Sequence, residues 1–286
     1  FIYDNWDIDV DYRLKEKPVR FISREVVSVG EYLLVIRVKH EIGEHSMLVT
    51  DVKFRYDSPQ IEFENHLTAG DTHTLIRAEH DTTLFAQSYK CETQFGNLLR
   101  NTYPRDKSDI AKFEVCAHKY CDFAEYGYGV AMLNDCKYGH DIHDGVMRLT
   151  LLKSATYPNE IADRCVHHFT YSIAPHEGDY REAGIVQMAY DLNKPMTAVT
   201  LGAQEGKLSD SYSLVSVSAS NVILETVKKA EDSDDLILRM YEAYNKKVNT
   251  TVTLGFQPKR ATLVGLMEDE ISEVAVSGNS FTLPVK

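Results

Sequence analysis

The chain has 286 residues, 43% of them hydrophobic and 26% charged, an ordinary globular composition that excludes a disordered or collagen-like chain. Its 31 Lys and Arg against 43 Asp and Glu give a formal net charge of −12, which disfavours a protein that neutralises nucleic-acid phosphates, so we expect no nucleic-acid partner. No segment approaches the roughly 18 apolar residues of a membrane span, and we expect no membrane partner.

Both ends of the chain are abrupt, and its cysteines follow no disulfide framework. It begins at Phe1 without a signal segment and stops within the strand-like alternation of Ser280–Lys286, so we expect a piece of a larger protein. The five cysteines are an odd number at irregular spacing, unlike a small secreted domain. We therefore expect reduced thiols and a cytoplasmic location.

Alternation of apolar and polar side chains dominates the first part of the chain. The segment Leu34–Lys39 alternates aliphatic residues with Arg and Lys, and Val52–Tyr56 does the same. Asp57–Pro59 favours a turn, after which Ile61–Glu64 resumes the alternation. The pattern predicts antiparallel strands joined by a Pro-containing turn, with one packed face and one face in water.

The same pattern recurs along the rest of the chain, whereas helical periodicity is scarce. The spacing indicates one helix, Tyr180–Asn193, which Lys194-Pro195 ends. A terminal hairpin is expected around the turn Ser277–Asn279. Further strands are expected at residues 149–152, 169–173, 215–217, 222–224, 237–241 and 252–256.

Many strands without helical crossovers predict an all-β protein with at most one or two short helices. Such strands bury their apolar faces by sheet-on-sheet packing, so we expect a sandwich and disfavour a parallel α/β fold. A polar run with two glycines interrupts the strands at 196–212. We predict a large β domain over 1–200 and a small one over 201–286.

Three clusters of histidine, cysteine and acidic residues were weighed as metal or catalytic sites. Cys116–Cys121 includes His118, but no second pair of ligands follows, as zinc sites usually require. His140–Asp144 and His167-His168 are more typical of solvated turns. No G-x-S-x-G elbow is present, and 43 acidic residues nominate no glycosidase carboxylate pair. We expect neither a catalytic residue nor a metal ligand in this chain.

The stretch 123–139 is the richest in chemical groups. Gly127 and Gly129 flank Tyr128, so an extended chain would place Tyr126 and Tyr128 on one face, and the glycines permit a bend or a close approach of the backbone. Tyrosine rings pack on the C–H patches of sugars while their hydroxyls bond to sugar hydroxyls. The alternative is a strand with two tyrosines in the core.

Three segments carry a more specific signal than any single motif. They are Phe113–Tyr120 (FEVCAHKY), Glu125–Gly139 (EYGYGVAMLNDCKYG) and His167–His176 (HHFTYSIAPH). Together they resemble the C-terminal β-region of α-mannosidases of glycoside hydrolase family 38, nearest to its cytosolic and bacterial branch. Further matching segments are 5–10, 189–195, 213–217, 225–232 and 239–243.

The resemblance implies a fold and an activity. It implies a galactose-mutarotase-like super-sandwich followed by a smaller, here truncated, β-sandwich. It also implies that the parent protein is a zinc-dependent retaining α-mannosidase acting on mannose-containing oligosaccharides. The zinc ligands and catalytic carboxylates of the family belong to an N-terminal catalytic domain absent from this chain, so the chain alone is expected to be inactive.

In the family, the β-region lends a tyrosine and other polar groups to the mannose cleft. The resemblance carries this substrate-binding role to Tyr126 or Tyr128, with Asn134 and Asp135 as weaker candidates. Expected partners are the oligosaccharide, the N-terminal catalytic domain of the same protein and, in a homo-oligomer, further copies. Residues 66–81 lack the Trp and Phe-Pro pair usual in the family, which puts substrate contacts there in doubt. The alternative is a stand-alone, lectin-like carbohydrate-binding module.

Overall fold

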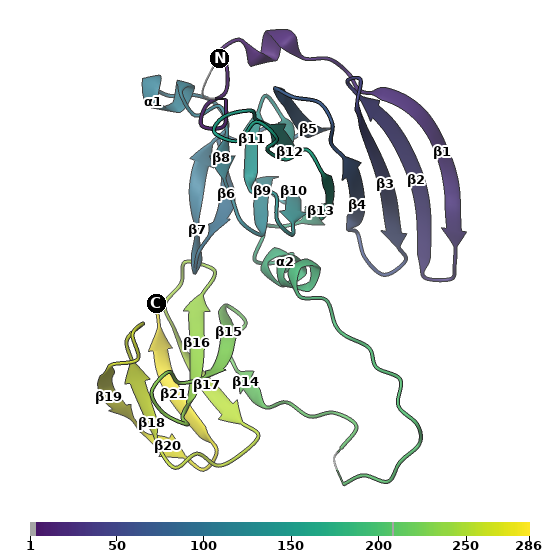
Figure 1. Cartoon of the computed structure of the whole chain (residues 1–286). Coiled ribbons are helices and arrows are strands. Elements are labelled where there is room, and N and C mark those ends of the chain that lie inside the picture. The colour runs from purple at the N-terminus through teal and green to yellow at the C-terminus, as the bar shows by residue number, and fades with distance from the viewer. Residues whose placement is uncertain (1–3, 208) are drawn as a thin grey trace. The chain divides into compact units, whose positions relative to one another are not determined.

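A computed structural model describes residues 4–207 and 209–286 (Figure 1). The chain divides into two compact units. Unit 1 comprises the residues up to Thr93 together with Leu98–Met196, and unit 2 comprises Gln94–Asn97 and Thr197–Lys286. Strands dominate both units, which confirms the predicted all-β class.

Unit 1 is built around a nine-stranded antiparallel sheet that faces a four-stranded one. The spatial order of the larger sheet is β1 (Arg20–Val29), β2 (Leu33–Ile42), β3 (Ser46–Arg55), β4 (Ile61–Thr68), β13 (Val166–Glu177), β10 (Tyr128–Asn134), β9 (Tyr120–Glu125), β6 (Ser88–Thr93), β7 (Gly96–Asn101). That of the smaller sheet is β5 (Thr74–Asp81), β12 (Val146–Ser154), β11 (Gly139–His143), β8 (Val115–Cys116). The helices are η1 (Tyr12–Lys15), α1 (Lys107–Ile110) and α2 (Ile185–Asn193).

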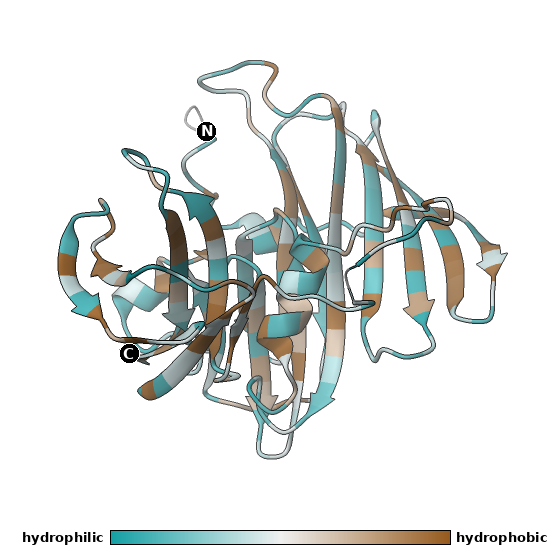
Figure 2. Cartoon of the chain, turned by 90° about the horizontal axis from the view of Figure 1, so that it is seen from below, coloured by the Kyte–Doolittle hydropathy of each residue, from teal (hydrophilic) through white to brown (hydrophobic). Residues whose placement is uncertain are grey.

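The core of unit 1 consists of apolar side chains from both sheets. Leu67, Phe123 and Met132 come from the larger sheet, Met147 and Leu149 come from β12, and all five are at most 1% exposed. Figure 2 shows the corresponding alternation of hydrophobic and hydrophilic bands along the strands. The period-two pattern of the sequence thus reflects strands with one buried face.

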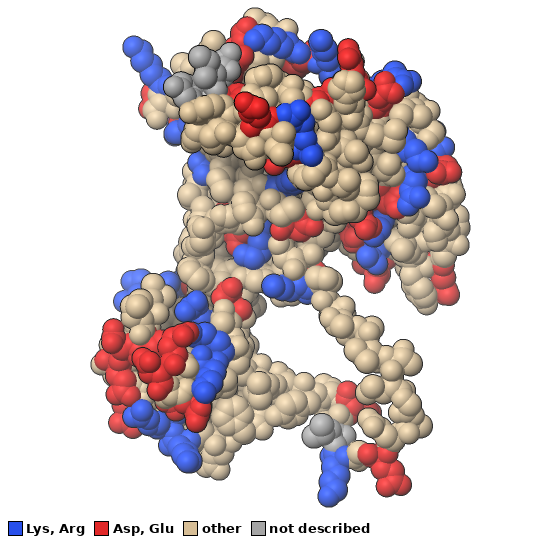
Figure 3. All heavy atoms as spheres, in the orientation of Figure 1, with Lys and Arg blue, Asp and Glu red and all other residues tan. Residues whose placement is uncertain are grey.

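The predicted hairpin around Asp57–Pro59 is confirmed. Strands β3 and β4 pair in antiparallel register, with Lys53 opposite Glu62 and Asp51 opposite Glu64. Arg55 Nε donates to Glu62 Oε1 at 2.8 Å. Lysine and arginine atoms lie beside acidic ones over this part of unit 1 in Figure 3. The charges that alternate with apolar residues therefore lie on one face of the sheet. The expectation that the apolar residues of this segment are packed is wrong for Phe54 and Tyr56, which are 36% and 86% exposed.

Helix α2 begins five residues later than the predicted helix. Gly184 precedes it with φ 68°, a left-handed conformation that interrupts helical hydrogen bonding, so Tyr180–Ala183 forms turns instead. Ile185, Val186 and Ala189 are buried where α2 contacts β9 and β10. The helix thus covers the central strands of the larger sheet on one face, while the four-stranded sheet faces the other.

Unit 2 is a small β structure of three sheets. These are β14 (Val215–Val217), β17 (Val248–Leu254), β21 (Ser280–Val285) and β20 (Val276–Ser277); β15 (Val222–Lys229) and β16 (Leu236–Glu242); and β18 (Ala261–Val264) and β19 (Glu270–Val274). Val252 and Tyr241 are in its core. The predicted C-terminal hairpin is confirmed as β20–β21, whereas the strand predicted at 252–256 ends at Leu254.

Candidate functional site

The β9–β10 hairpin carries the two tyrosines that the sequence nominated. Glu125 pairs with Tyr128, so Tyr126 and Gly127 form the turn between the strands. Gly127 has φ 84°, which explains the glycine at this position. The expectation that both tyrosines lie on one face of an extended segment is therefore wrong, because the chain reverses between them. Tyr126 projects fully into solvent, and Tyr128 is 43% exposed.

A buried histidine–aspartate pair lies directly behind this hairpin. Gly129 of β10 pairs with His176 of β13, and His176 Nε2–H donates to Asp122 Oδ1 of β9 at 2.7 Å. A Cβ atom at Gly129 would lie 2.5 Å from His176 Cε1 and 2.7 Å from Ala124 Cβ. Gly129 thus permits the close approach of the β10 backbone to His176, whereas Gly127 serves the turn. The His176–Asp122 pair holds together the three strands behind the tyrosine hairpin.

Burial and pairing set the protonation of this pair. Burial raises the pKa of Asp122, and the hydrogen bond from His176 only partly offsets this effect. Burial acts to lower the pKa of His176, but the hydrogen bond and charge of Asp122 outweigh it, so this pKa lies above its usual value. The 2.7 Å hydrogen bond thus joins two groups that are enclosed inside the sheet, at 8% and 3% exposure.

Asn134 and Asp135 lie at the other end of β10 and form a turn. The Asn134 side chain is buried, its amide donates to His118 O at 2.6 Å, and its oxygen accepts from Lys137 N at 2.8 Å. Asp135 Oδ2 accepts from Thr170 N at 2.8 Å, while Asp135 Oδ1 is buried without a partner among the described residues. The structure therefore separates these two residues from the tyrosine turn along the length of one strand.

The three segments that carried the family signal meet on neighbouring strands. Phe113–Tyr120 leads into β9, Glu125–Gly139 forms β10 and its two turns, and His167–His176 forms most of β13. Strand β10 lies between β9 and β13. Residues far apart in sequence, such as Asp122 and His176, thus build one local structure, and no motif predicted that these two would form a pair.

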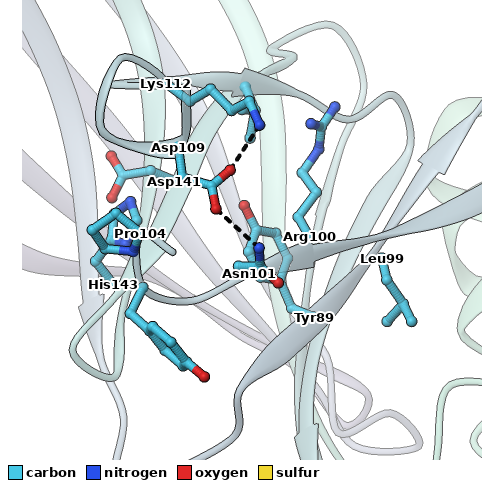
Figure 4. A pocket seen from close by; sticks show the side chains of 11 residues that line it. Tyr89, Leu99, Arg100, Asn101, Pro104, Asp109, Lys112, Asp141 and His143 are labelled. Carbon is cyan, nitrogen blue, oxygen red and sulfur yellow. Dashed lines mark hydrogen bonds and ion pairs between the residues drawn. The ribbon is translucent and has the colours of Figure 1, made fainter. Parts of the chain in front are cut away.

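A pocket of about 110 Å³ opens elsewhere in unit 1, at the edge where β6 and β7 face β8 and β11 (Figure 4). Its lining includes Tyr89 and Arg100 from the larger sheet and Asp141 and His143 from β11. The segment 101–112 completes it. Asp109 of that segment accepts from Asn101 Nδ2 at 3.1 Å and from Lys112 Nζ at 2.8 Å. No periodicity or motif marked this pocket, because its residues come from five separate segments.

The structure places the other cysteine and histidine clusters of the sequence in different environments. Cys116 is exposed on β8 whereas Cys121 is buried in the core. His140 is 1% exposed, so the reading of His140–Asp144 as a solvated turn is wrong at that residue. Within residues 4–207 and 209–286, no three or more His, Cys, Asp or Glu residues are grouped as metal ligands. The described helices include none long and apolar enough to cross a membrane.

Comparison with protein families matches both parts of the chain. The C-terminal domain of glycosyl hydrolases family 38 matches residues 2–160, and the C-terminal β-sandwich domain of the same family matches residues 221–286.

Relatives match across almost the whole chain. Alpha-mannosidase 2C1 of Homo sapiens is 34% identical over 278 residues, which covers 93% of this chain and 26% of that protein. Alpha-mannosidase G of Dictyostelium discoideum is 31% identical over 264 residues, 90% of this chain and 24% of that protein. The chain thus spans about a quarter of the length of these curated relatives.

The fold has solved counterparts. The crystal structure of an alpha-mannosidase from Enterococcus faecalis V583 superposes with a TM-score of 0.78 over 94% of this chain and 35% of that one, at 14% sequence identity. The crystal structure of a family 38 glycosyl hydrolase protein from Enterococcus faecalis gives a TM-score of 0.74, with 94% and 37% covered, at 14% identity.

Proposed function

The chain belongs to glycoside hydrolase family 38, as its motifs predicted, and corresponds to the C-terminal region of that family. From this premise we propose that it is the C-terminal β-region of a retaining, zinc-dependent α-mannosidase that removes terminal α-mannose from oligosaccharides. The relatives named alpha-mannosidases support the activity of the parent protein. The share of their length that this chain spans leaves ample room for a separate catalytic domain.

The zinc ion of the proposed mechanism does not fit the residues of this chain. In the described residues no cluster of three or more His, Cys, Asp or Glu side chains is arranged to hold an ion. Zinc in catalytic sites usually has three protein ligands and an open position. We therefore assign the ion and the catalytic carboxylates to the parent protein outside this chain, and assign no bond-breaking step to residues described here. The five free cysteines suit the cytoplasmic location that we propose.

The role proposed for the β-region is to support the catalytic domain and complete one wall of the mannose site. The observation that carries this role is the convergence of the three family segments on β9, β10 and β13. The exposed Tyr126 and Tyr128 lie on the hairpin of β9 and β10, next to the buried His176–Asp122 pair. An exposed phenol on a rigid hairpin can stack on a sugar and exchange hydrogen bonds with its hydroxyls. Asn134 and Asp135 are less suited, because the side-chain hydrogen bonds of the first are already made within its turn.

The parent enzyme provides the direct test of this role. Replacement of Tyr128 by Phe, or of Tyr126 by Ala, in the full-length protein is expected to lower kcat/KM for an aryl α-mannoside about tenfold, corresponding to one lost hydrogen bond or stacking contact. The exposed Tyr56→Phe variant, on a different turn, is the matched control. Unchanged kinetics in both hairpin variants would remove the hairpin from the mannose site, and the family assignment would still stand.

The 286-residue chain by itself separates this proposal from the alternative of a lectin-like module. We expect no hydrolysis of an aryl α-mannoside above background and no saturable mannose binding at the hairpin, because half of a site wall binds weakly. Titration of mannose monitored by the fluorescence of Trp6 and the tyrosines provides the measurement. Hydrolysis at a rate near that of an intact family enzyme would contradict the proposal. Saturable binding that Tyr126→Ala abolishes would favour the lectin.

A further inference from the structure

The pocket of Figure 4 is lined by polar groups that can donate hydrogen bonds. Arg100 Nε is buried and has no partner among the described residues. Tyr89, a residue only 3% exposed, also lines the pocket, and its hydroxyl is a further potential donor. Buried polar groups are normally satisfied, because an unmade hydrogen bond costs about 1–3 kcal/mol. Arg100 Nε is therefore one buried donor beside this pocket without an acceptor in the described part of the chain.

His143 adds an acceptor to the same pocket. Its Nδ1 lies 2.9 Å from Thr102 O, and a carbonyl can only accept, so Nδ1 carries the hydrogen. In the tautomer with the hydrogen on Nδ1, Nε2 is an acceptor, and His143 lines the pocket. The set of Tyr89, Arg100 and His143 thus both donates and accepts.

The carboxylates that line the pocket are already neutralised. Asp141 is 2% exposed, pairs with Arg77, and accepts from Arg148 Nη1 at 3.2 Å. Asp109 is paired with Lys112 at 2.8 Å. An incoming anion would meet both carboxylates, and an incoming cation would meet Arg100 and Lys112. The charge distribution therefore favours a neutral ligand.

The pocket also has the size and the walls for a small ring. Its volume of about 110 Å³ is several times the roughly 10–15 Å³ that one water needs. The ring of Tyr103 and the side chains of Leu99 and Val115 contribute apolar surface. Sugars combine C–H patches with hydroxyls that donate and accept, which matches apolar walls together with donors and an acceptor.

We propose that this pocket binds a neutral monosaccharide unit or polyol. Sugar hydroxyls would accept from Tyr89 and Arg100 and donate to His143 Nε2. The pocket is built by β6, β7, β8, β11 and the segment 101–112, and shares no residue with the Tyr126–Tyr128 hairpin. It is therefore a second carbohydrate site, separate from the mannose-site wall. Only the choice of mannose as first probe rests on the proposed function.

Methyl-labelled NMR of the 286-residue chain tests the proposal at the pocket itself. Leu99 and Val115 line the pocket, so their methyl resonances report directly on occupancy, whereas Val252 in the core of unit 2 serves as an internal reference. Titration with mannose, glucose and galactose is expected to shift the Leu99 and Val115 methyls saturably for at least one sugar, with a dissociation constant on the order of millimolar. No saturable shift with any of the three overturns the proposal.

Two variants and one control identify the contacts. Tyr89→Phe removes one hydroxyl and keeps the ring, and His143→Leu removes the acceptor, so each is expected to weaken binding about tenfold. Tyr128→Phe is expected to leave the Leu99 and Val115 shifts unchanged. If Tyr89→Phe and His143→Leu both bind the sugar as tightly as the unmodified chain, the assigned contacts are wrong. The same holds if Tyr128→Phe binds it more weakly than the unmodified chain. Tighter binding of inorganic phosphate than of any sugar overturns the neutral ligand class.

Discussion

At Gly129 the backbone of β10 passes so close to His176 that no side chain fits. We predict that Gly129→Ala destabilises unit 1 by about 2 kcal/mol, because a Cβ 2.5 Å from His176 Cε1 must displace a side chain held by Asp122. Gly96→Ala, where a Cβ would meet nothing within 4 Å, is the control and should change stability by less than about 0.5 kcal/mol. Urea unfolding gives both values, and equal stability of the two variants would contradict the prediction.

His140 makes the stability of unit 1 depend on pH. Burial lowers the pKa of His140 to about 4, so the folded protein keeps it neutral while the unfolded chain binds a proton below about pH 6.5. The contribution of His140 to stability is fully present above the pKa that this group has in the unfolded chain. It is lost as the pH falls toward and through the pKa of His140 in the folded protein.

The measurement is urea unfolding at pH 7 and pH 5. Between these values we expect His140 to account for a loss of about 2 kcal/mol, and this part of the loss should be absent from His140→Leu. Because the variant also changes packing, only the difference between the two pH values is compared. A pH dependence that is identical in both proteins would contradict the buried, neutral state of His140.

At the scale of the element, α2 shows how a short helix is stabilised by what it covers. Nine residues are too few for a stable isolated helix, so its stability comes from packing against β9 and β10. Ile185, fully buried at the first helical position, is the main anchor. Just before the helix, the ring of Tyr180 stacks on that of Tyr120 of β9, with ring centroids 6.1 Å apart.

We predict that Ile185→Ala destabilises unit 1 by about 3 kcal/mol, because it removes buried methyl groups and leaves a cavity. The exposed Gln187→Ala variant on the same helix is the control, and we expect a change below about 0.5 kcal/mol. Thermal unfolding monitored by circular dichroism measures both. A small loss in Ile185→Ala would mean that the helix is not anchored on the sheet.

At the scale of the whole molecule, the chain consists of two β units joined by an exposed segment. The described residues between α2 and β14 form neither helix nor strand, and they are exposed throughout. The division into domains at residue 200 stays a prediction, and limited proteolysis tests it.

A glutamate-specific protease is expected to cut first after Glu205. An exposed segment without strand-to-strand hydrogen bonds fits readily into the active site of a protease. Two fragments that keep the circular-dichroism signal of β structure are expected, and Glu205→Gln should abolish this first cut. Dominant early cleavage within β1–β13 would contradict the predicted division. Mass spectrometry identifies the cut site in either case.

The sequence by itself determined the class of fold and the family. Strand alternation is a local property, so Leu34–Lys39 and the hairpin at Asp57–Pro59 could be predicted from residue types alone. The family signal was equally local, because each segment is a continuous stretch. Gly127 and Gly129 were flagged correctly as sites of a bend or close approach, although the sequence could not tell which glycine did which.

Only the tertiary structure decided what depends on strands meeting across long separations. It turned the chain between Tyr126 and Tyr128, buried His140, joined His176 to Asp122, and began α2 at Ile185 after a left-handed glycine. It also gathered five separate segments around the pocket of Tyr89 and His143. The burial of His140, the His176–Asp122 pair and the pocket follow from which side chains the pairing order of the strands brings together, and such long-range pairing leaves no periodic trace in the sequence. The turn after Tyr126 and the start of α2 are instead local, because each depends on a glycine with positive φ.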